Sequence, residues 1–160
     1  MARETAEIPA AAGRLLARAD LFTNLAERIE RAKPRIMVFC GRGSSGHVGV
    51  YLRYLFEVRL GMVASAAAPS VVTAYRRPPD FRDALFVVVS QSGRSPDVID
   101  ATQMARKFGA LTLAIVNDEN SPAATASELV LPIGAGTEQS VAATKTVVLS
   151  MIAGAQLVAA

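Results

Sequence analysis

The stretch Leu85-Phe86-Val87-Val88-Val89-Ser90-Gln91-Ser92-Gly93-Arg94-Ser95-Pro96-Asp97 guides the interpretation of the whole sequence. Its apolar first half is typical of a strand buried on both faces. A short polar turn follows. Ser95-Pro96-Asp97 then predicts a helix start, because each residue type suits its position there. Backbone N–H groups point outward at such a start, so the pattern predicts an anion site, while an ordinary βα loop with a capped helix is the alternative.

Composition indicates one globular domain of 160 residues, since 51% of the residues are hydrophobic and 19% are charged. The net charge is only +3 and aromatic residues are 6%, so we expect no nucleic-acid partner. The longest apolar stretch, Val147–Ala160, is short for a membrane span, and we expect no membrane partner. A single cysteine, Cys40, excludes an internal disulfide and favours a cytoplasmic location. We see no pattern for a metal and expect no cofactor.

The N-terminal segment, residues 1–34, predicts a helical hairpin of two short helices. Leu21, Leu25 and Ile29 recur at four-residue spacing on one face, and Asp20 is a candidate cap for the second helix. Lys33-Pro34 ends the segment. We expect the hairpin to cover one side of a sheet or a partner subunit, and we see no chemistry in it.

Strands and helices alternate over residues 35–160. Expected strands cover residues 35–40, 62–67, 85–90, 110–116 and 128–132. The alternation predicts an α/β fold: a three-layer αβα sandwich with a five-stranded parallel sheet. The last helix is apolar and runs to Ala160 without a stop signal, which suggests a second half beyond this sequence. Its face over Val147–Val158 and the N-terminal helices are candidate interfaces, so we expect a homodimer.

Three loops rich in glycine and hydroxyl groups each follow an expected strand: Gly41–His47, the turn at Ser90–Ser95, and Gly134–Lys145. Parallel sheets bind ligands beyond the carboxyl ends of their strands, so convergence of three such loops predicts a ligand site. Gly41-x-Gly43-x-x-Gly46 matches the bare dinucleotide pattern, but its two serines suit a phosphomonoester at least as well.

Three motifs together resemble the sugar isomerase (SIS) domain family. They are Gly41-Arg42-Gly43-Ser44-Ser45, Ser90-Gln91-Ser92-Gly93-Arg94-Ser95 and Gly136–Lys145. The third motif, and Glu7-Ile8-Pro9 near the start, are similar to the double-SIS type, which includes glucosamine-6-phosphate deaminases and the isomerase half of glutamine–fructose-6-phosphate transaminase. The resemblance implies a flavodoxin-like SIS domain over residues 35–160, the first of two, preceded by N-terminal helices over 1–34. It also implies a sugar phosphate partner, glucosamine 6-phosphate or fructose 6-phosphate.

The resemblance further implies a set of phosphosugar-binding residues. They are Ser44, Ser45, Ser90, Gln91, Ser92, Ser95, Glu138, Val141 and Ala143. The serines and Gln91 would surround the phosphate, Glu138 would shape the pocket, and Val141 and Ala143 would approach the sugar through their backbone. Ala143 stands where the synthases usually carry serine.

No catalytic residue is assigned in this sequence. In double-SIS enzymes the acid–base glutamate, the ring-opening histidine and a mobile lysine lie in the second half. His47 is explained as a helix-start residue, Lys145 as a structural charge or a charge beside the phosphate, and Cys40 as a small core residue.

Two functions are therefore weighed. The first is the phosphosugar-binding SIS domain of an amino sugar phosphate deaminase or isomerase, which would convert glucosamine 6-phosphate to fructose 6-phosphate and ammonia. The alternative is a non-catalytic phosphosugar-sensing or regulatory SIS module. A single-domain isomerase that borrows Glu138 or His47 from a symmetry mate is a third possibility.

Overall fold

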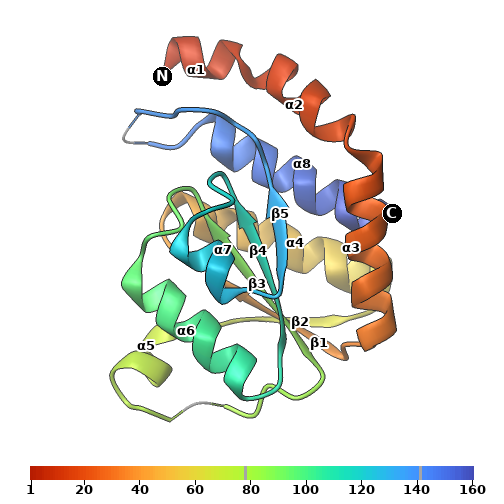
Figure 1. Cartoon of the computed structure of the whole chain (residues 1–160), viewed down its shortest axis with the longest axis vertical. Coiled ribbons are helices and arrows are strands. Elements are labelled where there is room, and N and C mark those ends of the chain that lie inside the picture. Colours follow the sequence, from red (N-terminus) through yellow and green to blue (C-terminus); the bar gives the residue numbers. More distant parts are fainter. Residues whose placement is uncertain (78, 141) are drawn as a thin grey trace.

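Five parallel strands form the centre of the structure, and helices cover both faces of their sheet (Figure 1). The computed structural model describes residues 1–77, 79–140 and 142–160. The strands are β1 (Ile36–Cys40), β2 (Val63–Ala66), β3 (Ala84–Ser90), β4 (Leu111–Val116) and β5 (Leu129–Pro132). The helices are α1 (Ala2–Ala6), α2 (Ile8–Leu16), α3 (Ala19–Ala32), α4 (Ser44–Leu60), α5 (Pro69–Thr73), α6 (Pro96–Lys107), α7 (Pro122–Ala126) and α8 (Lys145–Ala159). The predicted three-layer α/β architecture is confirmed.

The strand order is β2-β1-β3-β4-β5, and every neighbouring pair is parallel. After β1 the chain adds β2 on one side and then crosses back to place β3 on the other side of β1. The direction of winding therefore reverses between β1 and β3, where Cys40 is paired with Val88. In open parallel sheets this reversal opens a crevice at the carboxyl ends of the two strands, and ligands bind there.

Strand β3 is buried along its whole length, as its run of valines predicts. Leu85, Val87 and Val89 pack with the helices on one face of the sheet. Phe86 and Val88 pack into a separate cluster on the other face. Successive side chains of a strand point to opposite faces, so one apolar run supports both layers of helices. Full burial of each such side chain contributes about 1.5–3 kcal/mol.

Helices α4 and α8 lie on one face of the sheet, α5, α6 and α7 lie on the other, and α2 and α3 pack over α8 (Figure 1). Residues Val147–Val158 of α8 are all buried or half-buried. The apolar face of α8 is thus covered by α2, α3 and α4 of the same chain. The expectation that this face forms a subunit interface is wrong, because its burial needs no second copy.

The N-terminal segment contains three helices rather than the predicted two-helix hairpin. Residue Glu7 separates α1 from α2, and Pro9 lies in the first turn of α2. Asp20 is not the predicted cap: Arg18 occupies the N-cap of α3, and Asp20 lies one step inside the first turn. Helix α3 ends before Lys33-Pro34, as that signal predicts, and Lys33 at its C-cap adopts a left-handed conformation. Within the described part of the chain, no helix combines the length and apolar character needed to cross a membrane.

Candidate functional site

The second loop, residues 91–95, joins β3 to α6 and holds its own shape. The Ser90 hydroxyl accepts a hydrogen bond from the Gly93 amide at 3.0 Å, and the Ser92 hydroxyl accepts one from the Arg94 amide at 3.3 Å. Ser90 is buried, whereas Ser92 is exposed. Because each hydroxyl oxygen accepts within the loop, its own O–H group is left to donate outward.

Gly93 is the residue that allows this turn. Its φ is +63°, a conformation that residues with a side chain rarely adopt. A Cβ placed on Gly93 would lie 2.2 Å from the Ser121 hydroxyl, which belongs to the loop after β4. The Gly93 carbonyl also accepts from the Ala123 amide at 3.0 Å. Close contact between the two loops therefore requires glycine here.

Helix α6 begins as the sequence predicts, with Ser95 at the N-cap and Pro96 at the first helical position. The Ser95 side chain forms no capping hydrogen bond and is half-buried. The first amides of this 12-residue helix have no partner within the helix and face its N-terminal end, which follows the carboxyl end of β3. Such an end carries a partial positive charge and suits an anion.

The first loop, residues 41–43, joins β1 to α4 and lies beside the second loop across the winding reversal. Ser44 and Ser45 form the first turn of α4 and are half-buried. Arg42 pairs with Asp97 at the start of α6, with 2.5 Å between guanidinium nitrogen and carboxylate oxygen. This ion pair links the two loops.

Cys40, at the end of β1, is buried. This burial, with the nearby Asp97 charge, raises the pKa of its thiol to about 12. The interpretation of Cys40 as a core residue is confirmed.

The third loop, residues 133–144, joins β5 to α8 and is held by residues from elsewhere in the chain. The Asn117 side chain accepts from the Ala135 amide and donates to the Gly136 carbonyl, each at 2.8 Å. Gln91 of the second loop donates to the Glu138 carbonyl at 3.4 Å. The second and third loops are therefore in direct contact at the carboxyl edge of the sheet.

The Glu138 carboxylate closes the third loop onto α8. It accepts from the Thr144 amide at 2.9 Å, from the Thr146 amide at 3.3 Å, and from the hydroxyl groups of both threonines. Partial burial raises the pKa of Glu138, but these hydrogen bonds outweigh it and leave the pKa below its ordinary value. Glu138 is thus an ionised helix cap and is poorly suited to act as a proton-transfer base.

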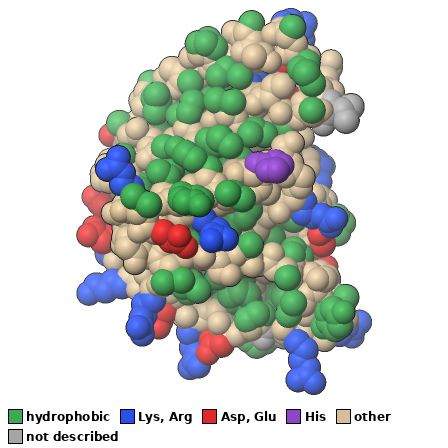
Figure 2. Space-filling view, turned by 180° about the vertical axis from the view of Figure 1, so that it is seen from behind, with side chains coloured by type: hydrophobic (Ala, Val, Ile, Leu, Met, Phe, Trp, Pro, Cys, Tyr) green, Lys and Arg blue, Asp and Glu red, His purple; other side chains and the backbone are tan. Residues whose placement is uncertain are grey.

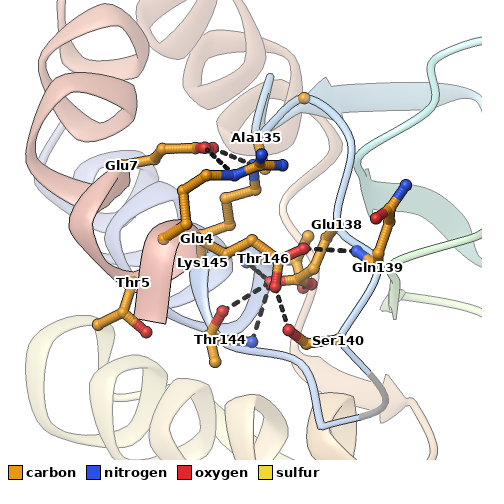
Figure 3. Close-up of polar contacts among 12 residues, drawn as sticks. Glu4, Thr5, Glu7, Ala135, Glu138, Gln139, Ser140, Thr144, Lys145 and Thr146 are labelled. Atoms are coloured by element: carbon orange, nitrogen blue, oxygen red, sulfur yellow. Dashed lines mark hydrogen bonds and ion pairs between the residues drawn. The ribbon is translucent and has the colours of Figure 1, made fainter. Parts of the chain in front are cut away.

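The carboxylates of Glu4 and Glu7 also hold the third loop and the start of α8 (Figure 3). The sequence analysis found no chemistry in the N-terminal segment and therefore missed these contacts. Glu4 contacts Gln139 and Ser140 of the third loop, and Glu7 pairs with Lys145 at the start of α8. Their three-residue spacing places both acids on one side of the segment. No local signal indicates partners more than 130 residues away.

The predicted site residues divide into two groups. Those of the first and second loops flank the winding reversal: Ser44, Ser45, Ser90, Gln91, Ser92 and Ser95. Glu138 and the half-buried Ala143 lie in the third loop, and Val141 lies outside the described residues. His47 is exposed on the first turn of α4. Asn117, Glu4 and Glu7 were not predicted as part of this region.

Lys145 is 2% exposed and pairs with Glu7, so it serves as a buried structural cation. Over residues 1–77, 79–140 and 142–160, no group of three or more His, Cys, Asp or Glu side chains is arranged to hold a metal ion.

This fold and these three loops define a doubly wound α/β domain with a candidate ligand site at its carboxyl edge. The SIS domain model matches residues 29–160, and the chain belongs to the SIS domain family. Glutamine–fructose-6-phosphate aminotransferase (isomerizing) of Campylobacter jejuni is 37% identical over 109 residues, which cover 68% of this chain and 18% of that protein. The chain therefore spans about a fifth of the length of that relative.

Two solved structures extend the comparison. A protein of Silicibacter pomeroyi DSS-3, provisionally assigned as a phosphosugar isomerase, has a TM-score of 0.94 and 42% identity, covering 98% of this chain and 48% of its own. The Vibrio vulnificus NanR protein, solved with ManNAc-6P, has a TM-score of 0.68 and 22% identity, covering 94% of this chain and 57% of its own. The second likeness establishes the fold alone.

Proposed function

We propose that this chain binds a phosphorylated sugar at the first and second loops, with the third loop over the sugar. The observation that carries the proposal is that two loops rich in hydroxyl and amide donors flank the winding reversal, joined by Arg42–Asp97, and that the third loop contacts the second through Gln91–Glu138. The C. jejuni relative is named for fructose 6-phosphate, and NanR was solved with a phosphorylated amino sugar, which supports the same ligand class.

The second loop is the proposed phosphate site. Ser90 and Ser92 keep their O–H groups for an outside acceptor, Ser95 has no capping bond, and α6 adds its amides and dipole. Donors that are already fixed lose little entropy when they close around a phosphate. An anchored phosphate would also position the far end of an opened sugar for reaction.

We further propose that the ligand is glucosamine 6-phosphate or fructose 6-phosphate, and that the domain forms part of an enzyme that isomerises and deaminates glucosamine 6-phosphate to give fructose 6-phosphate and ammonia. That chemistry needs a base that moves a proton between C2 and C1. The acids near the site already have partners: Asp97 forms an ion pair with Arg42, and Asp118 forms one with Arg94. Glu138 accepts hydrogen bonds from Thr144 and Thr146. We therefore place proton transfer on groups outside this chain.

The engaged carboxylates also favour the alternative, a regulatory module that binds the same sugar phosphate without turning it over. Incubation with glucosamine 6-phosphate in D₂O separates the two. Deuterium at C2 or released ammonia supports an enzyme. Binding without either, in a chain that includes any natural continuation of the sequence, supports the regulatory module.

Calorimetric titration with glucosamine 6-phosphate tests the binding proposal directly, with glucosamine and inorganic phosphate as controls. We expect saturable binding that needs both parts of the ligand. Ser95→Ala should weaken it about ten-fold without loss of stability, because Ser95 forms no capping bond. Ser70→Ala, an exposed serine on α5, is the matched control. Absence of binding by the folded wild type would overturn the proposal.

We also propose that the chain forms a homodimer, through α4 rather than α8. Val50, Tyr51, Tyr54 and Val58 lie on one face of α4 and are 37–75% exposed. Figure 2 shows hydrophobic side chains gathered around the one histidine on this side of the molecule.

Light scattering tests this surface. We expect a dimer mass for the wild type and a monomer mass for Tyr54→Glu, which places a charge at the centre of the α4 face. Tyr75→Glu changes an equally accessible tyrosine outside α4 and should leave the dimer intact. A monomeric wild type would contradict the homodimer.

We also propose that the protein is located in the cytoplasm, because its single cysteine is buried and free.

A further inference from the structure

Helix α1 reverses the usual pattern of burial. Its only buried residue is Glu4, at 5% exposure, while Ala2, Arg3, Thr5 and Ala6 are all exposed. A five-residue helix is not stable by itself, and this one buries no apolar side chain against the rest of the chain. Its docking therefore depends on what the Glu4 carboxylate binds.

Glu4 binds the middle of the third loop. One carboxylate oxygen accepts from the Gln139 amide at 2.6 Å, and the other accepts from the Ser140 hydroxyl (Figure 3). The hydrogen bonds from Ser140 and Gln139 lower the pKa of Glu4 to about 2. The carboxylate is thus charged at neutral pH, and charge-assisted hydrogen bonds are the stronger kind.

A second carboxylate secures the other end of the same stretch. Glu7 pairs with the Lys145 ammonium at 2.5 Å, and Lys145 is buried where α8 begins. The stretch from Gln139 to Lys145 is therefore held at both ends by residues next to or within α1. Among the described residues of this stretch is Ala143, a position that the family resemblance assigns to the sugar.

We infer that Glu4 is a positioning residue for the sugar: it docks α1 onto the third loop and fixes the loop in the shape that receives the ligand. The inference rests on the proposed sugar phosphate site. Asn117 fixes the loop near Ala135 and Gly136, and Glu138 fixes its end at α8. Among the described contacts, only Glu4 holds the side chain of Ser140. A loop fixed in advance binds its ligand with a smaller entropic cost.

This arrangement makes ligand binding and α1 docking reciprocal. If a docked α1 raises the affinity for the sugar phosphate, then the sugar phosphate must stabilise the docked α1 by the same factor. Global stabilisation by Glu4 alone would not produce a ligand-dependent effect confined to α1 and the third loop. The linkage can therefore be measured apart from folding.

The experiment compares the wild type with Glu4→Gln, Ser140→Ala and the double variant. Glu27→Gln, an exposed glutamate on α3, is the matched charge control. Titration with fructose 6-phosphate should give about ten-fold weaker binding for Glu4→Gln and a smaller loss for Ser140→Ala, which removes only one of the two hydrogen bonds from the loop to Glu4. The double variant should bind no more weakly than Glu4→Gln, because the Ser140 hydroxyl acts through Glu4. In the Glu4 and Ser140 variants, hydrogen exchange at residues 139–146 should be faster than in the wild type, whereas exchange at residues 90–95 should be unchanged. Fructose 6-phosphate should slow exchange at residues 2–7 in the wild type and in Glu27→Gln, and less so in the Glu4 and Ser140 variants.

The outcomes separate this inference from the proposed function. A folded wild type that does not bind fructose 6-phosphate or glucosamine 6-phosphate overturns the proposed function and, with it, the inference. A wild type that binds, together with a Glu4→Gln variant of equal affinity, overturns the inference and leaves the proposed function standing. Faster exchange in both the second and third loops of Glu4→Gln would indicate general destabilisation and would also overturn the inference.

Discussion

The second and third loops lie in contact at the same edge of the sheet but are built in different ways. The side-chain hydrogen bonds that shape the second loop join residues three or fewer positions apart, and one backbone bond, from the Ala123 amide to the Gly93 carbonyl, adds support from the loop after β4. The third loop is shaped by Asn117, 18 and 19 positions away, and by Glu4, 135 and 136 positions away. A locally shaped loop can form with its strand and helix, whereas the third loop needs most of the fold before it takes its shape.

The largest expected effect comes from Gly93→Ala in the second loop. Alanine at positive φ costs about 1–2 kcal/mol, and its Cβ would meet the Ser121 side chain, which adds about 1–3 kcal/mol of overpacking. Gly134→Ala in the third loop, also at positive φ but with open space around it, should cost only the backbone part, about 1–2 kcal/mol. Urea unfolding measures both. Equal losses would contradict the close fit between Gly93 and Ser121.

The next effect concerns the distant support of the third loop. Glu7→Gln leaves the Lys145 ammonium buried without its countercharge, whereas Lys145→Met leaves a Glu7 carboxylate that is 44% exposed and can be hydrated. We expect Glu7→Gln to lower the thermal midpoint more than Lys145→Met does. The double variant should resemble Lys145→Met. The reverse order would mean that Lys145 stabilises the protein by some contact other than Glu7.

Acid should affect the two loops differently. The pKa of Glu4 is lowered from 4.5 to about 2, so its contribution to stability is complete above about pH 4.5 and is lost as the pH falls toward 2. The pKa of Glu138 is also lowered from 4.5, so its contribution is likewise present above that pH and is lost on acidification below it. Glu4→Gln and Glu138→Gln should therefore show a shallower loss of stability over this range in acid titration followed by circular dichroism. Residues 90–95 contain no carboxylate, so Ser92→Ala should keep the wild-type slope. A Glu4→Gln profile parallel to that of the wild type would contradict this assignment.

The same difference explains what the sequence could predict. The strand over Leu85–Ser90, the start of α6 at Pro96 and the glycine in the turn are local features, and local patterns predicted them. The docking of Glu4 and Glu7 could not be predicted, because an acidic residue in a short exposed helix usually faces solvent. Asp20 illustrates a related limit. A cap and a first-turn acid lie one or two residues apart, so composition alone cannot place the helix boundary.

The smallest effect comes from removing one hydroxyl from each loop. Ser92 is exposed and accepts a 3.3 Å hydrogen bond, so Ser92→Ala should change the free energy of unfolding by less than about 0.5 kcal/mol. Ser140 donates to a buried carboxylate, so Ser140→Ala should cost more, because that carboxylate loses a donor where water cannot readily replace it. Their effects on sugar phosphate binding should nevertheless be similar, because Ser92 would contact the phosphate directly while Ser140 would act through the shape of its loop. Urea unfolding and calorimetry on the same samples measure both quantities. If Ser92→Ala lost stability without losing affinity, the second loop would be an ordinary capped turn, and the hydroxyl groups at this edge of the sheet would need another explanation.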